Sequence, residues 1–194
     1  MRRDRLTAFT DGVLAVIITI MVLEMKPPHG ASLADLATLW PVFLSYVLSF
    51  IYIAIYWNNH HHFFHLVEEV DGAILWANMN LLFWLSTVPF TTAWMGENHF
   101  EAIPTALYGG SLLAAAVAYY VMQSLIIRRQ GPDSSVRRAI GRDLKGKVSP
   151  FVYLAGIALA FVSPLAADLL YLAVALTWLV PDRRIETAIR EAKP

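Results

Sequence analysis

Long apolar segments are the feature that most constrains how this chain can fold. A helix needs about 20 mostly apolar residues to cross the hydrocarbon core of a bilayer, and six segments of the sequence meet or approach that length. The apolar runs are too long and too many for the core of a globular domain. We therefore predict an all-α, polytopic membrane protein in which residues 1–194 form one six-helix transmembrane domain, with helices at about 7–25, 36–58, 73–95, 103–127, 148–162 and 165–180.

The composition agrees with this prediction. The chain is 57% hydrophobic and only 15% charged, whereas about a quarter of the residues in soluble domains are charged. There is no cysteine, which excludes disulfides, Cys-ligated zinc and thiol nucleophiles. The formal net charge is zero and the motifs of phosphate loops and zinc peptidases are missing. We therefore expect no nucleic-acid partner, no enzyme activity, no metal and no cofactor.

Basic residues gather on one side of the predicted membrane. With a cytoplasmic N-terminus, Lys26 is the one Lys or Arg outside and the other 14 lie inside. Because cytoplasmic segments carry the excess of basic residues, both termini are predicted to be cytoplasmic. A charged start before an apolar run is also typical of a signal peptide. Glu24 and Pro27-Pro28 follow in place of a cleavage site, so we expect the first helix to be retained.

The first predicted helix carries two patterns of interest. One face holds residues spaced by three and four positions, Gly12, Val16, Thr19, Ile20 and Leu23. Every face of a membrane helix is apolar, so from the pattern alone lipid contact or helix packing is the simplest explanation of this face. The helix also begins with Arg5 and Asp11 near the membrane boundary, where an ionisable side chain is costly unless it is paired. A snorkelling arginine and an aspartate in the first turn are the alternative there.

Three segments resemble a known family in the same order. Arg5-x-x-x-Phe9-Thr10-Asp11 closely resembles the Arg-x-x-x-Phe-Ser-Asp signature of the transmembrane protein 175 family, which comprises lysosomal and prokaryotic potassium channels. Trp57-Asn-Asn-His60-His61 is similar to its Trp-x-x-His-His pattern, and the likeness continues at Leu75-Trp76-Ala-Asn78 and Pro89-Phe90. The resemblance covers roughly the first half of the chain.

This resemblance implies a homotetramer in which the first helix of each subunit lines a pore for potassium ions. The motif occurs once in the chain, so the pore requires three further identical subunits. Carried onto this sequence, the family's apolar constriction falls at Val16, Ile20 and Leu23, and the adjoining selectivity layer falls at Thr19. Val16 is smaller than the residue usual in the family. A bond from the Thr19 hydroxyl to the Ala15 carbonyl is the alternative role for this threonine.

The resemblance further implies a structural clamp around the signature. Its members come from the first three helices and can satisfy a buried carboxylate and guanidinium: Arg5, Phe9, Thr10, Asp11, Trp57, His60 and Asn78. The resemblance also implies a location in a prokaryotic plasma membrane, in contact with its lipids. The eukaryotic relatives carry two repeats, whereas this chain shows one.

A histidine cluster ends the second predicted helix, at His60, His61, His62 and His65. His61 and His65 are one helical turn apart and could share a metal ion, and a pH-sensing role is also open because imidazole titrates near neutrality. No carboxylate falls inside the cluster, so polar side chains at the membrane interface are the simplest explanation and we predict no metal site.

The predicted function is a modestly selective, potassium-permeable cation channel with a hydrophobic constriction. The alternative is a secondary cation/proton transporter that uses Asp11 and the histidines as proton carriers. Transporters usually show inverted repeats and broken helices with charges near the middle of the membrane. Asp11 lies near one edge and no repeat is visible, which favours the channel. A non-conducting membrane scaffold is a third possibility.

Overall fold

The computed structural model describes residues 3–67, 69–131, 134–141 and 143–179, and these residues are helical or connect helices, with no strand among them. The all-α prediction is thus confirmed for this part of the chain. Arg2, Arg142, the basic residues at 183–193 and position 180 lie outside it. The helices are α1 Arg3–Leu23, α2 Leu33–Ala37, α3 Trp40–His65, α4 Gly72–Ser86, α5 Val88–Glu97, α6 Ala102–Gln130, α7 Ser135–Ile140, α8 Leu144–Ala160 and α9 Pro164–Leu179.

Four stretches in the described residues are long and apolar enough to cross a membrane, namely α1, α3, α4 together with α5, and α6. α8 and α9 have 17 and 16 residues, which at 1.5 Å per residue gives helices about 24–26 Å long. They are shorter than the roughly 30 Å hydrocarbon core. The four long spans alone make this a multi-pass membrane protein.

The third predicted span, 73–95, is divided in two at Thr87. Pro89 lies in the first turn of α5, where its missing N–H costs no helical hydrogen bond. The Thr87 hydroxyl donates to the carbonyl of Trp84 (2.7 Å), which satisfies one carbonyl at the end of α4. The two short helices therefore cross the bundle as one interrupted span.

The second predicted helix, 36–58, begins later and runs further than the sequence suggested. α3 starts at Trp40 and continues to His65, so the histidines lie inside a helix. The polar residues after the apolar run do not end it because they bond back onto it. The Asn59 amide donates to the carbonyl of Ile55 (2.9 Å), and the His62 Nδ1–H donates to the carbonyl of Asn58 (2.7 Å).

Side-chain caps fix several helix starts. Ser32 and Asp35 form a capping box at α2, and this hydrogen bonding lowers the pKa of the Asp35 carboxyl. Asp71 accepts from the backbone N–H of Ile74 (2.9 Å) at the start of α4. The Arg129 guanidinium lies 3.0 Å from the Asp71 carboxylate, which ties the end of α6 to the start of α4.

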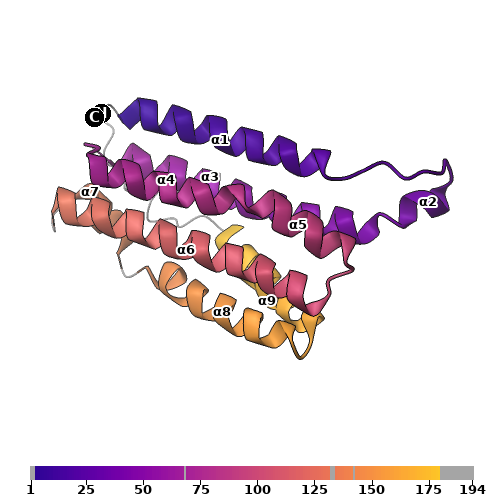
Figure 1. Ribbon diagram of the computed structural model, residues 1–194. Helices are drawn as coiled ribbons and strands as arrows, with labels where there is room; N and C mark the ends of the chain where they lie inside the picture. Colours follow the sequence, from indigo (N-terminus) through magenta and orange to yellow (C-terminus); the bar gives the residue numbers. More distant parts are fainter. Residues whose placement is uncertain (1–2, 68, 132–133, 142, 180–194) are drawn as a thin grey trace.

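The helices form a bundle with α1 at one edge and the α8–α9 hairpin at the opposite edge (Figure 1). α1 contacts α3, α4 and α5, while α6 packs on α4 and α8. α3 and α5 approach closely, because a Cβ added at Gly96 would lie 2.8 Å from the Cα of Val42. The described residues that contact α1 all lie to one side of it, so they cover α1 along that side only.

Candidate pore face and the contacts that orient it

The two faces of α1 differ sharply in exposure. Successive residues of a helix are about 100° apart, so the five buried side chains share one face: Leu6, Thr10, Leu14, Ile17 and Met21. On the other side, the exposed fractions are 55% for Val16, 39% for Ile20 and 77% for Leu23. Gly12 and Thr19 are exposed on the same side of the helix. We call the set Gly12, Val16, Thr19, Ile20 and Leu23 the exposed stripe.

A groove of about 840 Å³ runs beside this stripe, between α1 and α5. Val16 and Ile20 line its α1 side, and Phe90 and Trp94 line its α5 side. Phe90 is itself 64% exposed. Exposed apolar side chains on both walls of a groove are typical of a lipid-facing or subunit-facing region.

Thr19 directs its hydroxyl hydrogen back into its own helix. The hydroxyl donates to the carbonyl of Val16 at 2.8 Å, rather than to that of Ala15 as the sequence suggested. A hydroxyl oxygen keeps acceptor lone pairs when its hydrogen is donated. On an exposed side chain these lone pairs are available to a cation.

A buried chain of hydrogen bonds joins α1, α4 and α3. The Asn78 amide donates to the Thr10 hydroxyl (3.0 Å), and the Asn78 carbonyl lies 2.9 Å from His60 Nε2. Because that carbonyl is an acceptor, His60 Nε2 must carry the hydrogen. All three residues are at most 2% exposed, so breaking the chain would leave polar groups unsatisfied in the interior. The His60 ring also stacks on Phe64, with centroids 4.3 Å apart.

Two further contacts join α1 to α3 at a more exposed depth. The Trp57 indole N–H donates to Asp11 Oδ1 at 2.9 Å. Nearer the start of α1, the Arg3 guanidinium donates to the carbonyls of His65 (3.1 Å) and Val67 (3.2 Å). Arg3 thereby satisfies carbonyls at the end of α3. Sequence reasoning did not single out Arg3.

The signature residues are divided between the two faces of α1. Thr10 and Asp11 bond to α4 and α3, as described above, whereas Arg5 is exposed and Phe9 is 50% exposed. Arg5 and Phe9 precede Gly12 and Val16 at helical spacing, so they extend the exposed stripe toward the start of the helix. The structure brings together Thr10, Asp11, Trp57, His60 and Asn78 and leaves Arg5 and Phe9 apart from them.

Comparison with known proteins places the chain in a family. It is 51% identical over 191 residues to a potassium channel from Chryseobacterium sp. (strain P1-3), an alignment that covers 98% of this chain and all of that protein. Residues 5–89 also match the TMEM175 family model. This chain belongs to the TMEM175 family. It is also 34% identical to a potassium channel from Chamaesiphon minutus, over 82% of this chain and 84% of that one.

The TMEM175 family model, described as the endosomal/lysosomal potassium channel TMEM175, matches residues 5–89. That segment contains the exposed stripe and all the residues of the Thr10–Asn78–His60 chain and the Trp57–Asp11 contact. The fold agrees over a longer stretch. The crystal structure of a lysosomal potassium-selective channel TMEM175 homolog from Chamaesiphon minutus superposes with a TM-score of 0.82 at 30% identity, covering 93% of this chain and 97% of that one.

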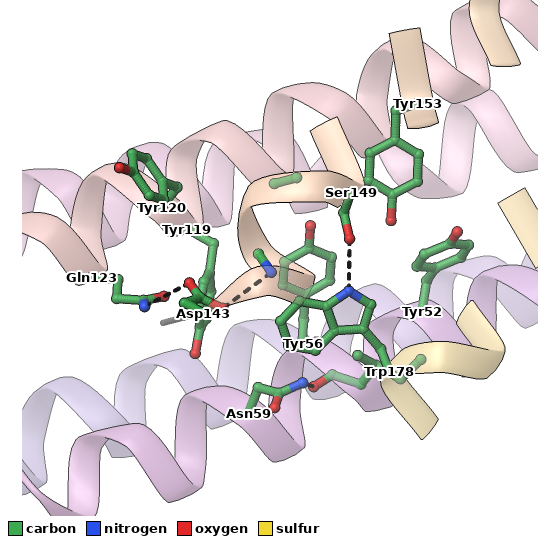
Figure 2. Close-up of a pocket in the computed structure, with 13 residues that line it drawn as sticks. Tyr52, Tyr56, Asn59, Tyr119, Tyr120, Gln123, Asp143, Ser149, Tyr153 and Trp178 are labelled. Carbon is green, nitrogen blue, oxygen red and sulfur yellow. Dashed lines mark hydrogen bonds between the residues drawn. The ribbon is translucent and has the colours of Figure 1, made fainter. Parts of the chain in front are cut away.

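A small aromatic cavity lies mostly outside the matched TMEM175 segment (Figure 2). It measures about 50 Å³ and is lined by residues of α3, α6, α8 and α9, together with Asp143 at the start of α8. The Trp178 indole N–H donates to the Ser149 hydroxyl (2.9 Å), and the Gln123 amide donates to Asp143 (2.9 Å). Sequence reasoning missed this feature, although Tyr52 and Tyr56 stand one turn apart on one face of α3.

Proposed function

We propose that this chain is the subunit of a modestly selective, potassium-permeable channel. The observation that carries the proposal is the exposed stripe of α1, which the described helices of the chain leave uncovered although it belongs to a transmembrane helix. Membership of a family that includes potassium channels supports the same conclusion. A passive channel needs no cofactor.

Four copies of the chain would enclose the pore. One α1 cannot surround an ion, and the sequence holds one copy of the motif, so a closed ring requires symmetry-related subunits. The groove between α1 and α5 offers a neighbouring subunit an apolar place to pack. Each subunit would contribute six spans, with the α8–α9 hairpin supplying the last two at the edge remote from the pore.

Val16, Ile20 and Leu23 would form the constriction. Rings of branched apolar side chains block ions by excluding water when narrow and admit them when wider. Thr19 would supply the selectivity layer, because its hydroxyl hydrogen is held by the Val16 carbonyl (2.8 Å) and its lone pairs are left for a partly dehydrated cation. Four hydroxyls replace less of a hydration shell than a stack of carbonyls, so selectivity should be modest.

The buried contacts would set which face of α1 meets the pore. Thr10, Asn78 and His60 fix the rotation of α1 against α4 and α3, and Trp57 with Asp11 does so near the interface. These five residues would form the clamp expected from the signature, without Arg5 and Phe9. Arg5 and Phe9, which lie on the exposed side, would instead stand at the cytoplasmic mouth of the pore.

The proposed location is the plasma membrane of a prokaryote, with both termini in the cytoplasm. The distribution of Lys and Arg supports this orientation, since 14 of 15 would face the cytoplasm. The basic residues around α7 would then lie level with the head groups of membrane lipids, which we take as the chain's other partners.

The second candidate is a cation/proton exchanger, and reversal potentials in planar bilayers separate the two. With protein purified to homogeneity and a potassium gradient alone, a channel gives a reversal potential close to that of potassium. Adding a pH gradient leaves this potential nearly unchanged in a channel and moves it in an electrogenic exchanger. A potential that follows the proton gradient, or no current from folded tetramers, would contradict the proposed function.

A further inference from the structure

Two exposed histidines face one another across one turn of α3. His61 and His65 are both exposed, and their Nε2 atoms lie 3.1 Å apart. The rings are nearly perpendicular, with centroids 4.6 Å apart. In this arrangement one Nε2–H donates to the lone pair of the other nitrogen, so the two imidazoles hold a single hydrogen between them.

This separation matches the spacing that a shared metal ion requires. Metal–nitrogen bonds of imidazole are about 2.0–2.1 Å long. Two nitrogens on one tetrahedral ion are therefore about 3.3 Å apart, and two on an ion with right-angle coordination about 2.9 Å apart. The observed 3.1 Å lies between these values. Because twice the metal–nitrogen bond length exceeds this separation, an ion bound to both nitrogens would lie to one side of the line that joins them, and both rings would turn toward it.

Contrary to the expectation from the sequence, we propose that His61 and His65 form a bidentate site for a late first-row divalent metal ion, Zn²⁺, Ni²⁺ or Cu²⁺. Imidazole nitrogen suits these metals, and affinity at such ligands rises toward copper. Among the described residues no third His, Cys, Asp or Glu joins the pair in a cluster, so the two imidazoles are the ligands that we assign.

The pair also lies where α3 holds the proposed pore helix. Trp57, one turn before His61, stacks on its ring with centroids 5.7 Å apart and planes 28° apart. The same indole donates to Asp11 of α1, and Arg3 of α1 donates to the carbonyl of His65. A bound ion that fixes the two rings therefore restrains the end of α3 that contacts α1. This consequence rests on the proposed function, and it predicts that metal changes the current.

Binding is tested on full-length protein purified without a polyhistidine tag. Calorimetric titration with Ni²⁺ should show about one ion per chain. His61→Gln and His65→Gln should each weaken binding at least about tenfold, since even an outer-shell partner of a metal costs that much. His62→Gln is the matched control, because His62 is adjacent but its Nδ1 already donates to the Asn58 carbonyl. With Cu²⁺, electron paramagnetic resonance should show coupling to two imidazole nitrogens.

Each outcome decides one part of the proposal. Absence of binding, or equal loss in His62→Gln and His61→Gln, would overturn the site. Currents recorded with Ni²⁺ on the side of the α3 end should change in the unmodified protein and stay constant in His61→Gln. A metal effect that persists in His61→Gln, or binding with no effect on current, would overturn the link to α1. If the protein carries no potassium current at all, the binding result still stands, so failure of the proposed function is distinguishable.

Discussion

α1 and the α8–α9 hairpin lie at opposite edges of the same bundle and are held by different means (Figure 1). α1 buries one apolar face in the bundle, is oriented by a few directed hydrogen bonds near one end, through Thr10, Asp11 and Arg3, and leaves its other apolar face uncovered. The hairpin packs tightly against α6, where Tyr171 fills the space left by Gly109 and Gly156. Under the proposed function, the closely packed hairpin stabilises the subunit itself, while α1 is the helix that other copies would complete.

The largest expected effect comes from filling the space around Tyr171. A Cβ at Gly156 or Gly109 would overlap the Tyr171 ring or its hydroxyl, and Tyr171 is fully buried. Gly156→Ala and Gly109→Ala should each destabilise the subunit by about 1–3 kcal/mol, the usual cost of overpacking. Thermal unfolding in detergent measures this.

Gly110→Ala is the matched control, because nothing lies within 4 Å of a Cβ at that position of the same helix. Its stability should equal that of the parent or exceed it by up to about 1 kcal/mol, because alanine favours a helix interior over glycine. Equal destabilisation by Gly109→Ala and Gly110→Ala would remove the contrast between the tightly packed edge and the rest of the bundle.

A loss of the same order is expected from Asn78→Leu, which keeps the number of side-chain heavy atoms and removes both hydrogen bonds. His60 Nε2–H and the Thr10 hydroxyl then lose their partner in the interior. Leaving such groups unsatisfied costs about 1–3 kcal/mol, so unfolding should occur at a lower temperature. In a double-mutant cycle with Thr10→Val, the two effects should fall short of additivity, because both variants remove the same bond.

Asn80→Leu serves as the comparison, since Asn80 is exposed two residues further along α4. It should leave stability nearly unchanged. Full additivity of Thr10→Val and Asn78→Leu would mean that the hydrogen-bond chain does not hold α1.

The smallest effect should come from Trp57→Phe. This change removes the indole N–H that reaches Asp11 but keeps an aromatic ring. Trp57 is 44% exposed, so water competes for the bond and the loss should stay below about 1 kcal/mol. Trp76→Phe, at a 78% exposed position of α4, is the control. If Trp57→Phe lowered stability as much as Asn78→Leu does, the Trp57–Asp11 contact rather than the buried hydrogen-bond chain would be the main contact that holds α1.

Much of this architecture follows from hydrophobicity alone. Apolar runs predict the long spans because a helix is the form in which a single segment can satisfy its backbone inside lipid. Helix ends are less predictable. α3 runs on to His65 because Asn59 and His62 bond to carbonyls of their own helix, a choice that composition does not reveal.

The site could be predicted less completely. The resemblance named Thr10, Asp11, Trp57, His60 and Asn78, and the structure brings these side chains into contact. It could not separate Phe9 from Thr10, since only the rotation of α1 in the bundle decides which of two neighbours is buried. The contact between His61 and His65 depends on the rotamers of both side chains. A spacing of four residues allows these rotamers but does not determine them.

The exposed stripe can be tested directly because the chain has no cysteine, so single cysteines can be introduced without background. Val16→Cys, Ile20→Cys and Leu23→Cys, recorded as channels in bilayers, should lose current on exposure to a water-soluble thiol reagent. Leu14→Cys and Ile17→Cys, on the buried face, should keep theirs. Block at the buried positions with protection at 16, 20 and 23 would contradict the assignment of this stripe to the pore.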